Sequence, residues 1–304
     1  MTQVFRSGFV AIIGRPNVGK STLVNALLGQ KIAPVTPRAQ TTRRRQLGIL
    51  TTDDFQMVFV DTPGIHKARH KLGEFLNQEA EAALPGVDAV LFLVDVSVVP
   101  TDEDRWIAAR LSRLARRTPL VLACNKTDLV PAGELEEALA VFQALLPAGT
   151  RTLPLSATSG SGLDSLVEIL AALLPERKPE YHPDQVTDLY EREIAAELIR
   201  EACLLKLRDE VPHGVAVRID EFTERGEQGA YIAATIFVER DSQKGIVIGK
   251  GGEMLKRIGT AARTEIEDMS GRKVFLELRV KVLKEWRKDE KAMKRFGYRI
   301  KKKK

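Results

Sequence analysis

The chain has 304 residues, enough for one large or two ordinary domains, and 44% of them are apolar, which excludes a mostly disordered chain. Residues 281–304 contain twelve Lys or Arg and three Asp or Glu, a net charge of +9, so the rest of the chain carries −3 of the overall +6. The basic character is therefore local. It indicates contact with a polyanion, with a solvated basic tail as the alternative.

Cysteine usage and hydropathy indicate a cytosolic protein. The two cysteines, Cys124 and Cys203, have no metal-ligand spacing and lie in apolar or helix-like stretches, so we expect both to be packing residues in a reducing compartment. The first residues show no signal-peptide pattern, and no apolar run reaches membrane-spanning length. A surface contact with a membrane through the basic end stays open.

Residues 9 to about 174 alternate short apolar runs with helix-like segments such as Glu103–Leu114 and Glu134–Leu146. The apolar runs are continuous rather than alternating, which is typical of strands buried on both faces. This pattern predicts an α/β domain with a mostly parallel sheet flanked by helices. The predicted strands are Phe9–Gly14, Met57–Val60, Ala89–Val94, Leu120–Cys124 and Leu153–Leu155.

A phosphate-binding loop follows the first predicted strand. Residues 14–21 read GRPNVGKS, which fits the P-loop pattern G-x-x-x-x-G-K-[ST], and they open a predicted helix, Ser21–Leu28. In such a loop backbone N–H groups and the helix N-terminus surround phosphate oxygens. We expect Lys20 to reach the β- and γ-phosphates and Ser21 to ligate Mg²⁺.

A second motif selects the base. Asn125-Lys126-Thr127-Asp128 ends the strand Leu120–Cys124, at the sheet edge where ligands bind. A carboxylate at Asp128 can accept two hydrogen bonds from guanine N1–H and the 2-amino group, which adenine lacks. We expect Lys126 to cover the base with its stem and Asn125 to tie this loop to the P-loop.

Two further segments complete the predicted site. Asp61-Thr62-Pro63-Gly64 follows the strand Met57–Val60; Asp61 is expected to hold a Mg²⁺-bound water and Gly64 to offer its N–H to the γ-phosphate. Ser156-Ala157-Thr158 follows the last strand and would direct N–H groups at guanine O6. Between the P-loop and Asp61, residues 40–45 read QTTRRR, where a Thr hydroxyl can ligate Mg²⁺ only with the γ-phosphate present, as in a switch; an ordinary basic loop is the alternative.

The combination of GRPNVGKS, QTTR and DTPGI resembles the translation-factor-related GTPases, within the group that contains the Era, EngA and tRNA-modification GTPases. That resemblance implies Thr42 as the switch ligand of Mg²⁺. Ile65 stands where Ras-like proteins have the water-orienting glutamine, and no arginine can be assigned as a finger, although Arg43 to Arg45 are candidates. The resemblance also implies that Asn17 holds an activating K⁺; the alternative is that Asn17 only braces the loop.

The predicted site residues fall into three groups by role. Those expected to act in hydrolysis are Lys20, Thr42, Gly64 and Asn17. The predicted metal ligands are Ser21 and Thr42 for Mg²⁺, Asp61 through water, and Asn17 for K⁺. The predicted nucleotide-binding residues are Gly14, Arg15, Pro16, Asn17, Val18, Gly19, Lys20, Ser21, Thr22, Asp61, Thr62, Pro63, Gly64, Ile65, Asn125, Lys126, Thr127, Asp128, Ser156, Ala157 and Thr158.

A proline-rich stretch, PERKPEYHP at 175–183, predicts a linker over 175–187 between a nucleotide domain at 1–174 and a second domain at 188–304 with a basic tail. The second domain alternates apolar and polar residues in its strands, as half-exposed sheets do. Its predicted elements are a helix at Asp188–Leu207, strands at Gly214–Phe222 and Tyr231–Glu239, helical segments from Gly245 to Met269, a strand at Val274–Val282 and a basic helix at Lys284–Phe296.

Gly249, Lys250, Gly251 and Gly252 form a G-x-x-G loop between two predicted helices, which in KH domains lets the protein backbone approach a nucleic-acid backbone. The element order is similar to a type II KH domain of the α+β class. We therefore predict these four residues as RNA-binding. Aromatic residues are scarce nearby, so base recognition would depend on hydrogen bonds and apolar packing.

A single GTPase domain followed by a KH domain closely resembles the Era proteins of bacteria. The resemblance implies a GTP-hydrolysing switch that binds 16S ribosomal RNA near its 3′ end, acts in assembly of the 30S subunit as a monomer, and contacts the inner membrane peripherally. Another RNA-directed GTPase is one alternative, but EngA-like proteins have two P-loops and this chain has one. An RNA chaperone with a regulatory nucleotide site is the other.

Overall fold

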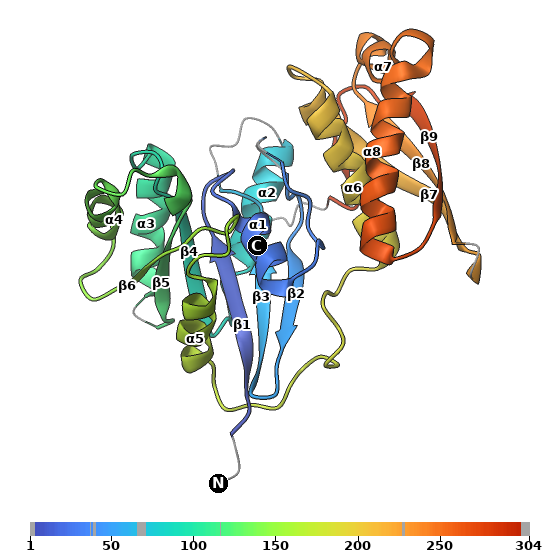
Figure 1. The fold of residues 1–304 in the computed structure, drawn as a ribbon. Coiled ribbons are helices and arrows are strands. Elements are labelled where there is room, and N and C mark those ends of the chain that lie inside the picture. Colours follow the sequence, from blue (N-terminus) through green and yellow to red (C-terminus); the bar gives the residue numbers. More distant parts are fainter. Residues whose placement is uncertain are drawn as a thin grey trace. The chain divides into compact units, whose positions relative to one another are not determined.

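The computed structural model describes residues 4–36, 38, 41–65, 71–115, 117–226 and 229–298. They divide into two compact units, which are described separately (Figure 1). Unit 1 comprises Met1–Lys31, Thr42–Lys67 and Leu76–Asp188. Unit 2 comprises Leu189–Lys304 together with Ile32–Thr41 and Ala68–Phe75. Two segments from the first half of the sequence thus belong, where described, to the unit formed by the second half.

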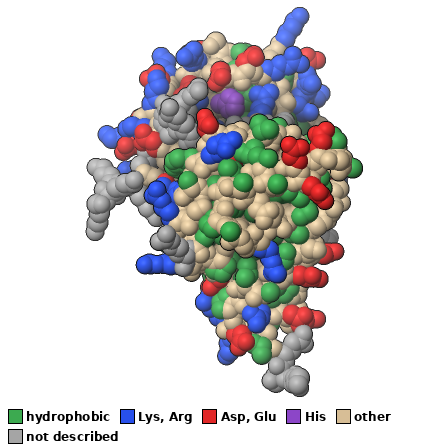
Figure 2. All heavy atoms as spheres, turned by 90° about the vertical axis from the view of Figure 1, so that its left-hand side faces the viewer, with side chains coloured by type: hydrophobic (Ala, Val, Ile, Leu, Met, Phe, Trp, Pro, Cys, Tyr) green, Lys and Arg blue, Asp and Glu red, His purple; other side chains and the backbone are tan. Residues whose placement is uncertain are grey.

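The face of the molecule drawn in Figure 2 has hydrophobic side chains among polar and charged ones. Within the described ranges, no helix combines the length and apolarity that crossing a bilayer requires.

A six-stranded sheet forms the centre of unit 1, in the order β2-β3-β1-β4-β5-β6 (Figure 1). All neighbouring strands are parallel except β2 and β3, which pair antiparallel. Parallel pairing brings the carboxyl ends of β1, β3, β4, β5 and β6 to one edge. The strands are β1 (Arg6–Ile13), β2 (Gln46–Thr51), β3 (Phe55–Asp61), β4 (Ala89–Asp95), β5 (Leu120–Asn125) and β6 (Arg151–Pro154).

The helices of unit 1 bury apolar side chains against this sheet. One core cluster combines inward residues of β1, β4 and β5 with residues of α3 and α4, among them Phe92, Ile107 and Phe142. Cys124 belongs to this cluster and is a free, buried thiol, as expected of a packing residue. The helices are α1 (Lys20–Leu28), α3 (Asp102–Leu114), α4 (Leu135–Gln143) and α5 (Leu163–Leu173), with a 3₁₀ turn at Thr127–Leu129. Helix α2 (Lys71–Ala82) is divided, since residues 71–75 belong to unit 2 and residues 76–82 to unit 1.

Three elements of the first 174 residues were not named among the predicted ones. The edge strand β2 continues the sheet beyond β3, α2 precedes β4, and α5 follows β6. The segment 175–187, predicted as a linker, is extended and hydrogen-bonded to unit 1. Ser7 N donates to Pro175 O at 3.1 Å, Ile49 N donates to Val186 O at 2.9 Å, and the Gln56 side-chain oxygen accepts from Tyr181 N at 2.9 Å.

Unit 2 contains a three-stranded sheet in the order β7-β8-β9. Its helices come before, between and after these strands in the sequence. β7 and β8 are antiparallel, whereas β8 and β9 are parallel. The order helix, strand, strand, helix, G-x-x-G, helix, strand is the predicted one. The elements are α6 (Glu191–Lys206), β7 (Ala216–Glu224), β8 (Ala230–Val238), α7 (Asp241–Ile248), α8 (Glu253–Ser270), β9 (Val274–Val282) and α9 (Glu290–Arg295), with 3₁₀ turns at Pro212–Gly214 and Lys250–Gly252.

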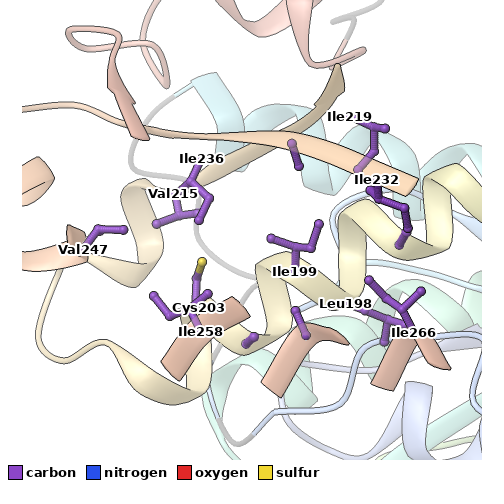
Figure 3. Packing of buried hydrophobic residues seen from close by; sticks show 14 of the residues in the cluster. Leu198, Ile199, Cys203, Val215, Ile219, Ile232, Ile236, Val247, Ile258 and Ile266 are labelled. Carbon is purple, nitrogen blue, oxygen red and sulfur yellow. The ribbon is translucent and has the colours of Figure 1, made fainter. Parts of the chain in front are cut away.

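The core of unit 2 lies between one face of this sheet and the helices α6 and α8. Ile199 and Cys203 of α6 face the strand that carries Ile232 and Ile236, whereas Leu198 lies beside Ile266 of α8 (Figure 3). Cys203 is fully buried, and burial raises the pKa of its thiol to about 12, so it behaves as a packing residue.

The basic helix predicted at Lys284–Phe296 is wrong over most of its length: only Glu290–Arg295 is helical. Glu285 has a φ of 49°, in the left-handed region, so a right-handed helix cannot run through it. Trp286 follows it and is completely buried, with its indole N–H donating to Gly214 O at 2.8 Å. Phe296 packs edge-on against this indole, with ring centroids 5.1 Å apart. Tertiary packing of two aromatic rings therefore overrides local helix propensity.

Candidate functional site

The loop between β1 and α1, residues 14–19, lies close enough to its neighbours to require glycine at both ends. A Cβ atom on Gly14 would lie 2.4 Å from the carbonyl oxygen of Leu93, and one on Gly19 would lie 2.3 Å from the side-chain nitrogen of Asn125. Gly19 also has a φ of 101°, which disfavours other residues. The loop is thus held between the ends of β4 and β5, at the edge where parallel strands end.

Lys20, the first residue of α1, folds back over this loop. Its ammonium donates to the carbonyl oxygens of Gly14 at 3.1 Å and Arg15 at 2.9 Å, and the residue is 6% exposed. Burial lowers the pKa of Lys20 to about 8, against the opposing effect of the Asp61 carboxylate. A buried ammonium beside a helix N-terminus is suited to bind phosphate oxygens.

Three oxygen-bearing side chains meet beside Lys20. Ser21 Oγ lies 2.8 Å from Thr42 Oγ1 and 2.8 Å from Asp61 Oδ2, and Thr42 Oγ1 lies 3.3 Å from the same carboxylate oxygen. Asp61 is completely buried; burial raises the pKa of its carboxyl, opposed by Lys20 and by hydrogen bonds from Ser21, Thr42 and Gln46. The other oxygen, Oδ1, is buried without a hydrogen-bond partner among the described residues. Two hydroxyls and an incompletely satisfied carboxylate fit a hard divalent cation such as Mg²⁺.

The segment after Asp61 lies against the P-loop. A Cβ atom on Gly64 would lie 2.5 Å from the backbone nitrogen of Pro16, so only glycine fits there. Thr62 donates its hydroxyl to Ile12 O at 2.7 Å and is buried. Ile65 is 3% exposed and belongs to the apolar core of unit 1, so its side chain cannot orient a water molecule as glutamine does. Of the predicted switch residues, Gln40 lies outside the described residues.

The loop after β5 is tied to the P-loop as predicted. Asn125 Nδ2 donates to Val18 O at 2.7 Å, while Asn125 Oδ1 accepts from Ala157 N at 2.9 Å. One amide thus joins the P-loop, the loop after β5 and the loop after β6. Asp128 and Thr158 are exposed, which leaves their polar groups at the surface of this edge.

The arginines near the site differ in how far they are exposed to solvent. Arg43 is 1% exposed, whereas Arg44 and Arg45 are exposed. Arg15, inside the P-loop, directs its Nε at Asp104 Oδ2 at 3.1 Å and lies 3.7 Å from Asp95 Oδ2.

Three polar residues near the site were not predicted from the sequence: Gln46, Asp95 and Asp104. Gln46 Nε2 donates to Asp61 Oδ2 at 3.5 Å, a contact that no spacing rule indicates because β2 itself was not predicted. Asp95 could have been found, since it ends a buried strand at the same sheet edge as Asp61. Asp104 is buried in the first turn of α3, where T-x-x-D at 101–104 fits a capping box; that pattern indicates a helix start and not a contact with the P-loop.

In unit 2 the four glycine-loop residues separate α7 from α8. Gly249, Gly251 and Gly252 have φ values of 75°, 60° and 83°, and a Cβ atom on Gly249 would lie 2.8 Å from Met254 N. A backbone of this shape is restricted to glycine, and it leaves Lys250 exposed at the surface.

A groove of about 470 Å³ begins at this loop and continues along α8 and β9. The two elements are in contact at Gly259, where a Cβ atom would lie 3.4 Å from Leu278 Cδ1, an ordinary van der Waals distance. The groove combines an apolar floor with basic side chains, which suits unstacked bases with their phosphates. The lining residues absent from the sequence prediction are Leu255, Lys256, Gly259, Thr260, Arg263, Leu276 and Leu278.

Comparison with known families separates the chain in the same way. Residues 9–126 match the model of the 50S ribosome-binding GTPase family, and residues 210–287 match the KH domain model. The protein called GTPase Era in Geobacter sp. (strain M21) is 49% identical over 295 residues, which are 97% of this chain and 98% of that protein. GTPase Era of Caldanaerobacter subterraneus subsp. tengcongensis is 46% identical over 297 residues, 97% and 99% of the two chains.

Two solved structures share the fold over nearly the whole chain. Era in complex with MgGDPNP and nucleotides 1506–1542 of 16S ribosomal RNA superposes with a TM-score of 0.91 at 37% identity, covering 97% of this chain and all of that one. A variant of Aquifex aeolicus Era bound to GDP·AlF4⁻ gives a TM-score of 0.91 at 38% identity with the same coverage. The predicted fold class, an α/β P-loop GTPase domain with a C-terminal KH domain, is confirmed.

Proposed function

Because the chain belongs to the Era family of GTPases, we propose that it hydrolyses GTP with Mg²⁺ and binds 16S ribosomal RNA near its 3′ end in assembly of the 30S subunit. The GTP hydrolysis part of this proposal rests on one observation. Side-chain oxygens of Ser21, Thr42 and Asp61 lie within 3.3 Å of one another beside the buried Lys20. The RNA half rests on the basic groove beside the glycine loop and on the RNA bound by the related Era.

We assign each side chain of the nucleotide site a separate task. Lys20 neutralises the β- and γ-phosphates, Ser21 and Thr42 ligate Mg²⁺, and Asp61 holds a metal-bound water. The Gly64 N–H donates to the γ-phosphate, close to the P-loop backbone against which that glycine lies. When bound, the metal supplies positive charge to the phosphate oxygens.

Base selection belongs to the second loop. Asp128, exposed at the sheet edge, accepts from the guanine N1–H and 2-amino groups, and Lys126 covers the base. Asn125 fixes the distance between this loop and the phosphates through its bonds to Val18 and Ala157. Of the three residues predicted to face guanine O6, Ser156 donates its N–H to Ser161 O at 2.9 Å and Ala157 donates its N–H to Asn125 Oδ1 at 2.9 Å. We therefore assign the N–H that faces O6 to Thr158.

The remaining assignments concern the whole molecule. The domain boundaries at 174 and 188, a monomeric state, a cytoplasmic location and a peripheral contact with the membrane are part of the same proposal. The membrane contact would use the basic end, and co-sedimentation with anionic vesicles at low and high salt tests it.

The decisive experiment measures GTP turnover with and without an RNA that corresponds to nucleotides 1506–1542 of 16S ribosomal RNA. A GTPase switch directed by this RNA turns GTP over alone and changes its rate when the RNA is added. A protein that binds the RNA normally but shows no turnover in either condition is instead a chaperone with a regulatory nucleotide site. An unrelated RNA of equal length is the control.

A further inference from the structure

A carboxylate that the nucleotide motifs do not include lies between the two nucleotide loops of unit 1. Asp95 is the last residue of β4, and its side chain is 8% exposed. Its Oδ2 accepts from the Lys126 ammonium at 2.6 Å, while its Oδ1 accepts from the Ser97 N–H at 3.1 Å and the Ser97 hydroxyl at 2.5 Å. The short turn after β4 thus fixes the carboxylate, and the carboxylate fixes the lysine.

The same oxygen also faces the P-loop. Arg15 has a guanidinium nitrogen 3.7 Å from Asp95 Oδ2, and its Nε donates to Asp104 Oδ2 at 3.1 Å. Asp104 is completely buried and accepts from the Thr101 N–H at 2.9 Å and hydroxyl at 2.7 Å, in a capping box that opens α3. The guanidinium is therefore held at the side of the P-loop by two carboxylates.

The charges in this cluster balance, two cations against two carboxylates. Burial by itself raises the pKa of the Asp95 carboxyl, but hydrogen bonds from Lys126 and Ser97 outweigh it and hold the pKa below its ordinary value. Asp95 is therefore an anion at neutral pH, which strengthens its hydrogen bond to the Lys126 ammonium.

We propose that Asp95 is a positioning residue for guanine nucleotide binding. It holds Lys126 in one rotamer before the base arrives and joins that lysine, through Arg15, to the loop that receives the phosphates. The proposal rests on the guanine nucleotide site proposed above. A lysine has a long stem with several rotamers, and ordering it in advance removes an entropic cost of binding. Asp95 itself touches neither base nor phosphate in this arrangement.

The geometry predicts which ligands are affected. Lys126 is assigned to the plane of the base rather than its edge, and the cluster includes none of the residues assigned to the γ-phosphate, which are Lys20, Thr42 and Gly64. Loss of the Asp95 charge should therefore lower the affinities for GDP, GTP and inosine diphosphate by the same factor. An effect on Asp128, by contrast, would change the ratio between GDP and inosine diphosphate, because inosine lacks the 2-amino group.

The test is a double-mutant cycle on GDP affinity, measured with the intact chain by calorimetry. Asp95→Asn should weaken GDP about tenfold, the scale of one hydrogen bond to a charged group. Lys126→Met, which keeps the stem and removes the ammonium, should cost a similar factor, and adding Asp95→Asn to Lys126→Met should cost little more. Asp102→Asn, on the exposed first turn of α3, is the matched control and should leave the affinity unchanged.

The inference is overturned if Asp95→Asn leaves GDP affinity unchanged, or if its full loss persists in the Lys126→Met background. Ser97→Ala removes only one hydroxyl donor to Asp95, and a two- to threefold loss of GDP affinity is expected, roughly a third to a half of the tenfold effect on the logarithmic scale. No loss in Ser97→Ala counts against the proposal even if Asp95→Asn fails to fold. A wild type that does not bind GDP would refute the guanine site itself, which separates the two failures.

Discussion

The hydroxyl of Thr42 lies 2.8 Å from the hydroxyl of Ser21, although one residue precedes β2 and the other lies in the first turn of α1. Both also approach Asp61 Oδ2, so three separate segments of unit 1 contribute oxygens to one point. Such convergence is what a metal ion bridging a switch and a P-loop requires.

Replacing Thr42 therefore tests the switch. Thr42→Ala removes one of the oxygens and should lower GTP turnover by on the order of a hundredfold, with GDP affinity almost unchanged, because the ligand is needed only with the γ-phosphate. Thr42→Ser keeps the hydroxyl and should retain most of the rate. Single-turnover hydrolysis over a Mg²⁺ titration measures both. Equal rates for Ala and Ser would exclude Thr42 as a metal ligand.

Nucleotide choice rests on Asp128. Asp128→Asn should weaken GTP about a hundredfold and improve binding of xanthosine triphosphate, because an amide can donate to the 2-oxo group of xanthine. Competition binding of GTP and xanthosine triphosphate to wild type and variant measures this change in preference. Unchanged preference for GTP in the variant would remove Asp128 from the base site.

The nucleotide motifs could be located from the sequence because each follows a buried strand, and strand ends collect at one sheet edge. The strand β2 could not, since its apolar stretch is short, follows a run of arginines and pairs only with β3 at the sheet edge. The helix expected around Trp286 failed because burial of that indole against Phe296 is a tertiary contact. Similarly, the pairing of Arg15 with Asp104 joins residues 89 positions apart, and no local pattern predicts it.

RNA binding rests on the glycine loop. Lys250→Asp combined with Gly251→Asp should abolish specific binding of an RNA of nucleotides 1506–1542, because two negative charges would face the phosphate backbone. Arg225→Asp with Gly226→Asp is a matched control, since Gly226 has nearly the same φ, 55° against 60°, and open space around it. Filter binding measures RNA affinity, and GDP affinity should survive in both variants. Normal RNA affinity in the loop variant would contradict the KH assignment.

The basic end makes a different, non-specific contribution. Residues 301–304, four lysines, lie outside the described residues. Deleting these lysines should lower the affinity for all RNA sequences by a similar factor. It should also flatten the dependence of log affinity on log salt by up to about 3, if each lysine contacts one phosphate of a single strand. A salt series with the specific RNA and a shuffled one measures this; a loss confined to the specific RNA would assign the tail to sequence recognition.

The last prediction concerns hydrolysis without a glutamine at Ile65. Negative charge grows on the β–γ bridging oxygen and γ-oxygens in the transition state, and many GTPases answer it with an arginine finger. Arg15 is held by Asp95 and Asp104, Arg43 is buried, and Arg44 and Arg45 are exposed, which favours a different source of positive charge. Asn17 sits in the P-loop with a left-handed φ of 65°, and we propose that its side-chain oxygen helps to hold a K⁺ ion.

Potassium should therefore accelerate GTP turnover, whereas sodium should not, because Na⁺ is too small to span the same oxygens. The measurement is turnover in KCl and NaCl at matched ionic strength, for wild type and for Asn17→Ala, with GDP affinity followed in parallel. Acceleration in KCl that Asn17→Ala abolishes, with GDP still bound, is the expected result. If Asn17 only braces the loop, both salts give equal rates in wild type, and the variant loses GDP affinity instead. A potassium response that persists undiminished in Asn17→Ala would place the ion elsewhere and refute the assignment.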